Sequence, residues 1–233
     1  LTLFSTAIQM PFLFWPAGTI FWLEAWTYLI IFFVTFSPIL IVLNNKNPEI
    51  LINRMKLKKQ MIRKEKGKAV EEKDVASKAS GTDKVIFPLL SVSFLAVFVI
   101  PALNKRYNWS IPLIWVEIIG FLLLPISLYI IYRVMLENAY ASKILDIRKD
   151  SGQKLIDSGP YAIVRHPMYS GFALMFFSIV LALGSWYALI PAVLAIIFLG
   201  IRIKFEEAML IEGLEGYKIY KEKVKYKLIP KIY

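Results

Sequence analysis

The stretch PMYSGFALMFFSIVLALGSWYALIPAVLAIIFLGI, residues 167–201, runs for 35 residues without a charged side chain. An α-helix rises about 1.5 Å per residue and the hydrocarbon core of a bilayer is about 30 Å thick, so this run is too long for one crossing. Gly184, Ser185 and Trp186 lie in its middle, where a turn is favoured. We therefore expect a hairpin of two short membrane spans whose outer ends return to the same side.

The rest of the chain is also apolar, and it contains further candidate spans. Apolar residues make up 58% of the 233-residue chain, whereas soluble domains are nearer 45–50% apolar. Stretches at about 19–43, 85–103 and 111–135 are long enough to cross a bilayer. Residues 1–15 are apolar but short, and indicate either the end of another span or a segment in the interface. The predicted fold class is an all-α, polytopic transmembrane helix bundle with about five spans, or six if residues 1–15 cross as well.

The positive charges predict how the bundle is oriented. Residues 44–84, 137–166 and 202–233 hold 25 of the 28 lysines and arginines, and the proposed spans put these segments on one side. By the positive-inside rule this side is cytoplasmic, which in a prokaryote means a plasma (inner) membrane protein. The net charge of +11 then indicates contact with anionic lipid headgroups rather than with nucleic acid.

We expect the chain to divide into two parts. Residues 1–137 would form N-terminal transmembrane helices with a basic cytoplasmic loop at 44–84, and residues 138–233 would form the catalytic region. Residues 64–84 are rich in charge and lack aromatic residues, so we assign them no chemistry.

A compact polar segment, GPYAIVRHPMYSG at 159–171, lies directly before the hairpin. Pro167 is well placed to begin a helix, which would put His166 near the N-cap. The free N–H groups and the positive end of the helix dipole at that point suit an anionic group. His166 is the one histidine of the chain and there is no cysteine, so disulfides and thiolate sites are excluded and no metal site is expected.

A second charged group follows the hairpin, in the sequence RIKFEEAML. Arg202 and Glu206 are four residues apart and share one helix face, with Glu207 about 100° round the axis. Because the hairpin returns to its starting side, these residues should come back near His166. Glu117 is a charge within the third predicted span, which makes it a candidate for lining a substrate cavity.

These motifs resemble a known family. NAYASKILDIRKDSGQKLIDSGPYAIVRHPMYSG, followed by RIKFEEAMLIEGLEGYKIYKEKVKYKLIP, is similar to the isoprenylcysteine carboxyl methyltransferases and, more broadly, to the membrane methyltransferases that include phospholipid methyltransferases. The strong similarity covers about residues 138–230. Two earlier pieces, NPEILINRM and TDKVIF, resemble the bacterial and archaeal branch.

The resemblance implies methyl transfer from S-adenosylmethionine, with S-adenosylhomocysteine as product and without a Rossmann domain. A cytoplasmic cofactor pocket would lie next to the helical hairpin. It implies that Arg202 faces the substrate and that Arg202 and Glu206 are the catalytic pair. The implied cofactor-binding residues are Gln153, Lys154, Leu155, Ile156, Tyr161, His166, Pro167, Met168, Tyr169 and Glu206. From their places in the two motifs we add Arg165, Gly171 and Glu207 to the expected cofactor site.

Several functions stay open at this point. In our leading hypothesis Arg202 holds the carboxylate of a lipophilic or lipidated acceptor, such as a prenylcysteine-like or isoprenoid acid, whose apolar tail enters between the hairpin and the third span. A lipid amine is an alternative acceptor. Membrane sterol reductases carry a related R-H-x-x-Y-x-G stretch but bind NADPH, and a noncatalytic membrane-binding protein is the third alternative.

Overall fold

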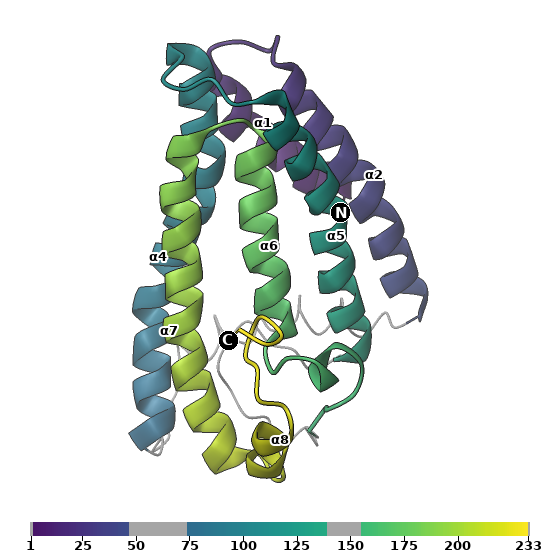
Figure 1. Ribbon diagram of the computed structural model, residues 1–233, viewed down its shortest axis with the longest axis vertical. Coiled ribbons are helices and arrows are strands. Elements are labelled where there is room, and N and C mark those ends of the chain that lie inside the picture. Colours follow the sequence, from purple (N-terminus) through teal and green to yellow (C-terminus); the bar gives the residue numbers. More distant parts are fainter. Residues whose placement is uncertain (1, 47–73, 139–154, 233) are drawn as a thin grey trace, which may run out of the picture.

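The computed structural model describes residues 2–46, 74–138 and 155–232, and the regular structure among them is helical. Figure 1 shows a bundle of long helices with α6 at its centre. The helices are α1 (Thr2–Ala17), α2 (Leu23–Lys46), α4 (Asp74–Tyr107), α5 (Ile114–Glu137), α6 (Pro167–Ala182), α7 (Leu189–Gly213) and α8 (Tyr217–Lys223), with 3-10 turns η2 (Gly159–Ala162) and η3 (Trp186–Ala188). The predicted all-α bundle is confirmed.

Four of these helices are long and apolar enough to cross a membrane. Their apolar parts are Leu23–Asn45, Thr82–Tyr107, Ile114–Glu137 and Trp186–Gly213, and α6 is a shorter apolar helix of 16 residues. The N-terminal end of α1 lies part-way along the long axis of the bundle (Figure 1).

Helix α4 begins well before the span predicted at 85–103. It starts at Asp74, so its first turns belong to the segment that we expected to be a cytoplasmic loop. Residues 75–84 include two alanines and two lysines, which favour a helix, and they contain no proline that would end one. As a result, residues near 83 lie on a helix that packs against α7.

The predicted hairpin is present, formed by α6 and α7. The chain turns at Gly184, whose φ of +66° favours glycine, and a Cβ there would lie 2.7 Å from the side chain of Pro112. With 25 residues, α7 is much longer than α6. The last turns of α7 therefore run past the first residue of α6 (Figure 1).

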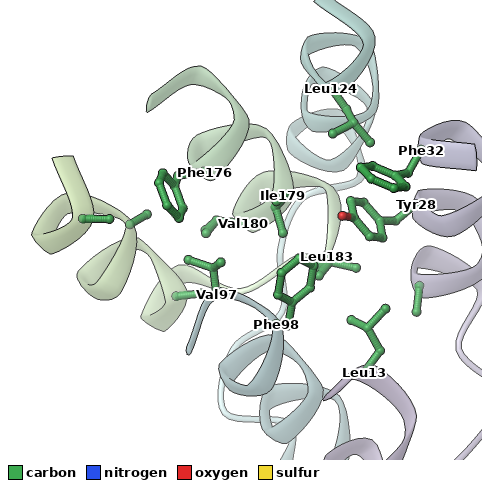
Figure 2. Close-up of a cluster of buried hydrophobic side chains, with 14 of the residues drawn as sticks. Leu13, Tyr28, Phe32, Val97, Phe98, Leu124, Phe176, Ile179, Val180 and Leu183 are labelled. Carbon is green, nitrogen blue, oxygen red and sulfur yellow. The ribbon is translucent and has the colours of Figure 1, made fainter. Parts of the chain in front are cut away.

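The core lies around α6, where side chains of α1, α2, α4 and α5 meet it (Figure 2). Tyr28 and Phe98 are buried there with ring centroids 5.9 Å apart. The Tyr28 hydroxyl is not left unpaired, since it donates to Gln9 Oε1 at 2.6 Å. Ring packing and a satisfied polar group together fix how α1, α2 and α4 pack against one another.

Two glycines allow α5 and α6 to approach closely. A Cβ at Gly120 would lie 2.2 Å from the backbone nitrogen of Ala182, and one at Gly171 would lie 2.7 Å from the side chain of Ile131. Small residues at helix interfaces in membranes permit this close packing. Gly171, which we expected among the cofactor-binding residues, therefore packs against α5.

We predict that Gly120→Ala destabilises the protein, because the neighbouring atoms are backbone and cannot move aside. Overpacking of this kind costs about 1–3 kcal/mol. Gly200→Ala is the matched control, since a Cβ at Gly200 meets nothing within 4 Å. Thermal unfolding in detergent should show a lower melting temperature for the first variant and an unchanged or higher one for the second. Equal melting temperatures would contradict this account of the interface.

Candidate active site

The register of the hairpin brings the start of α6 level with the end of α7. Tyr169 lies thirteen residues before the end of α6, and Arg202 lies thirteen residues after the start of α7. His166, directly before α6, is in turn level with Glu206 and Glu207. The sequence predicts that the residues at the start of α6 and the end of α7 lie close together, and the structure brings these side chains together.

A buried ion pair joins the two helices. Arg165 Nε donates to Glu207 Oε1 at 2.6 Å, and His166 Nε2 lies 3.3 Å from the same oxygen. The three side chains are buried. Lys227 Nζ lies 3.9 Å from the other oxygen of Glu207. Removing one partner from such a pair leaves an uncompensated buried charge, so the cluster ties residues 165–166 firmly to α7.

Arg165 also binds the C-terminal segment, residues 224–228. Its Nη1 donates to two backbone carbonyls at 2.7 Å each, and the N–H groups of Arg165 and His166 donate to two more at 2.9 Å. Ser170 Oγ donates to a fifth at 2.6 Å. The accepting carbonyls are those of Val224, Lys225, Tyr226, Lys227 and Leu228. Arg165, which we expected to contact the cofactor, thus satisfies backbone groups of the C-terminal segment.

Aromatic side chains of α8 support the entry to α6. Tyr217 and Tyr220 pack with Val224 and the half-buried Leu155. Burial raises the pKa of both phenols, so they stay protonated. The Tyr220 hydroxyl donates to the backbone oxygen of Tyr161 at 2.7 Å, which fixes η2 against α8.

Tyr169 links the cationic and anionic side chains of α7. Arg202 Nη1 donates to the Tyr169 hydroxyl at 2.6 Å, and that hydroxyl donates to Glu206 Oε2 at 2.6 Å. A guanidinium has no acceptor, so the direction of both bonds is settled. The ring of His166 stacks on that of Tyr169, with centroids 5.7 Å apart and planes 8° apart. Glu206 keeps 25% of its side chain exposed, so it remains accessible.

Asp83 of α4 completes this cluster, and the sequence analysis missed it. Arg202 Nε donates to Asp83 Oδ1 at 3.0 Å and Arg202 Nη2 to Oδ2 at 3.4 Å. Phe87 covers the guanidinium, with Cζ 4.7 Å from the ring centroid. Residues 64–84, to which we assigned no chemistry, thus include one residue that forms an ion pair with Arg202. The available signal was an acidic residue at the very start of an apolar span.

The other predicted cofactor residues have varied surroundings. Asn138 Nδ2 donates to the Tyr161 hydroxyl at 2.9 Å. Met168 packs with Leu43 and Met135 on the α2 and α5 side. Pro167 begins α6, as expected, and Ile156 is half-buried. Gln153 and Lys154 lie outside the described residues.

Glu117 lies at the other end of the bundle and is not part of this cluster. It is in the first turn of α5, close to Gly184 at the hairpin turn, and is 8% exposed. With Glu24 and Lys105 it lines a separate cavity of about 120 Å³. The structure therefore does not bring the predicted substrate residue Glu117 to Arg202.

A larger groove of about 520 Å³ is lined by neighbours in sequence of Arg165, His166 and Tyr169, but not by these three side chains themselves. It lies between α5, η2, the start of α6 and the C-terminal segment, and its lining is mostly apolar. Pro167 and Ser170 face this groove, whereas His166 and Tyr169 face α7, about 100° away around the axis of α6. The lining residues are Tyr129, Ile130, Arg133, Gly159, Pro160, Ile163, Val164, Pro167, Ser170, Leu228 and Pro230.

Most residues of this cluster lie in a segment that matches a known protein family. Residues 114–216 match the model of the phospholipid methyltransferase family. This segment is a phospholipid methyltransferase domain. The domain runs from α5 through the hairpin to the start of α8, and contains His166, Tyr169, Arg202 and Glu206. A search of curated proteins found no match.

The family assignment confirms the resemblance drawn from the sequence, since this family includes the isoprenylcysteine carboxyl methyltransferase-like membrane enzymes. It supports a membrane methyltransferase rather than a sterol-type reductase or a noncatalytic binding protein. Asp83 and the C-terminal segment 224–228 lie outside the matched residues, yet contact the domain's charged side chains.

We predict that Glu207→Gln releases the C-terminal segment, because Arg165 then loses its buried counter-charge. Breaking such a pair costs about 3–5 kcal/mol. Limited trypsin digestion of the detergent-purified protein should cut after Lys225 at least ~10-fold faster than in the wild type. Glu212→Gln, an exposed position on the same helix, should leave the rate unchanged. If both variants are cut at the wild-type rate, Arg165 does not depend on Glu207 in this way.

Proposed function

We propose that this protein transfers a methyl group from S-adenosylmethionine to the polar head of a lipophilic acceptor in the membrane. The observation that carries the proposal is the match of residues 114–216 to a methyltransferase family, over the segment in which the charged cluster converges. The concentration of basic residues at 137–166 and 202–233 supports a site on the cytoplasmic side.

The chemistry of the cluster fits this donor. S-adenosylmethionine supplies an electrophilic methyl group on a sulfonium, together with an amino-acid ammonium and sugar hydroxyls. Glu206 is accessible and would accept hydrogen bonds from such groups. Arg165 and Glu207 would hold His166 in place, since Glu207 contacts both side chains. Roles for Leu155, Ile156 and Tyr161 remain predictions from the resemblance.

With a carboxylate as acceptor, the reaction needs orientation more than a strong base, whereas an amine acceptor also has to release a proton. A nucleophilic atom of the acceptor forms the new bond to the methyl carbon while the carbon–sulfur bond breaks and its electron pair stays on sulfur. Holding the two reactants in line supplies much of the rate enhancement in such displacements. The hydrogen-bonded cluster of Arg202, Tyr169 and Glu206 is a rigid frame for that purpose.

The groove beside α5 is the best candidate for the acceptor's tail. Its apolar lining and volume of about 520 Å³ suit a hydrocarbon chain, and it adjoins the start of α6. An entrance between the hairpin and the third span stays a prediction, and the position of this groove supports it. Arg133 lines the same groove and would lie near a polar head at the membrane surface.

Two acceptor heads fit different observations. The resemblance implies a carboxylate, such as that of a prenylcysteine-like acid, bound by Arg202. An amine of a phospholipid headgroup is the second candidate, and a specific observation favours it. Asp83 already accepts hydrogen bonds from Nε and Nη2 of Arg202, so a carboxylate would have to displace Asp83 to bind this edge of the guanidinium.

The test is methyl transfer from S-[methyl-³H]adenosylmethionine by the full chain in lipid vesicles. One set of vesicles contains N-acetyl-S-farnesylcysteine and the other phosphatidylethanolamine. We expect tritium in one acceptor, and Glu206→Gln should reduce the rate at least ~10-fold, because a charge-assisted contact to the donor is weakened.

Glu212→Gln is the matched control, since this glutamate is exposed on the same helix, and it should transfer at the wild-type rate. Label in the farnesylcysteine alone would select the carboxylate, and label in the phospholipid alone the amine. Absence of donor binding and of transfer to either acceptor by the wild type would refute the proposed function.

A further inference from the structure

Asp83 stands apart from the matched family domain, yet it is built into the charged cluster. It lies on α4, 119 residues from Arg202 in sequence, and is 5% exposed. Its carboxylate takes two hydrogen bonds from one edge of the guanidinium, at 3.0 and 3.4 Å. Phe87, one helical turn further along α4, covers the guanidinium face. Helix α4 thus holds Arg202 by both its edge and its face.

The orientation of Arg202 determines that of the side chains beyond it. Its Nη1 points to the Tyr169 hydroxyl, which can then donate its single proton only to Glu206. This produces a chain of hydrogen bonds from Asp83 through Arg202 and Tyr169 to Glu206. The end of the chain, Glu206, is its most exposed member and the candidate contact to the donor.

Asp83 also prevents a competing arrangement. Arg202 and Glu206 are four residues apart on α7, the spacing at which opposite charges pair directly along a helix. A buried guanidinium without Asp83 would need another counter-charge, and Glu206 is within reach. Direct pairing would withdraw Glu206 from the donor and break its bond with Tyr169. Asp83 satisfies Arg202 from the opposite side and leaves Glu206 with Tyr169.

We propose that Asp83 is a positioning residue of the methyl-transfer site. It acts through Arg202 and Tyr169 to hold Glu206 in its reactive orientation. This inference rests on the proposed function, and it extends the site to α4, outside residues 114–216. Substitution of a residue that only joins helices would lower the stability of the protein. Substitution of a positioning residue lowers kcat, the rate at which the enzyme–substrate complex reacts.

The test compares Asp83→Asn with Asp83→Glu in the methyl-transfer assay, measuring kcat and the KM for the acceptor separately. Misplacement of reacting groups by about 1 Å can cost about 100-fold in rate. We therefore expect Asp83→Asn to lower kcat 10- to 100-fold with the acceptor KM changed less than ~3-fold. Asp83→Glu keeps the negative charge and should recover at least a third of the wild-type kcat. Lys84→Gln, the exposed neighbour on α4, should match the wild type.

A double-mutant cycle with Tyr169→Phe adds a second measurement. If Asp83 acts through Tyr169, the combined variant should lose little more kcat than Tyr169→Phe alone. Wild-type kcat in a folded Asp83→Asn protein, or multiplicative losses in the cycle, would overturn the inference while leaving the proposed function intact. If Asp83→Asn does not fold, a kcat for Asp83→Glu as low as that of Tyr169→Phe would overturn it. An inactive wild type would overturn both.

Discussion

The arrangement of this protein depends on the need to neutralise charges that lie inside an apolar helix bundle. An unpaired ion buried away from water costs several kcal/mol, so each buried cation requires a nearby anion. Arg165 forms an ion pair with Glu207, and Arg202 forms one with Asp83. These pairs connect α4, the start of α6 and the end of α7 at one end of the bundle. The contacts that neutralise these charges therefore also bring the residues of the candidate site together.

The hairpin and its consequences could be predicted because they follow from length. A charge-free run of 35 residues must turn within the membrane, and a turn in its middle brings its two ends back together. This argument alone predicts that His166 lies near Arg202 and Glu206. The family resemblance then supplied their chemistry, and the match of residues 114–216 agrees with it.

Other contacts could not be predicted, because they join segments with no local relation in sequence. No sequence pattern near Asp83 indicates that its partner is Arg202. Arg165 binds backbone carbonyls of residues 224–228, which any amino acid supplies, so the sequence there does not reveal the contact. Single residues also have more than one use. Gly171 accommodates Ile131 of α5, and Glu117 lies at the hairpin turn, away from the charged cluster. Helix packing determines both outcomes.

The location of the donor site is tested most directly by photolabelling the full chain with S-[methyl-³H]adenosylmethionine, followed by peptide mapping. The account predicts tritium in peptides from residues 155–171 or 202–228, with labelling suppressed by excess S-adenosylhomocysteine. Label confined to peptides of α1, α2 or the Glu117 end of α5, or label that the competitor does not suppress, would contradict the assignment of the charged cluster as the methyl-transfer site.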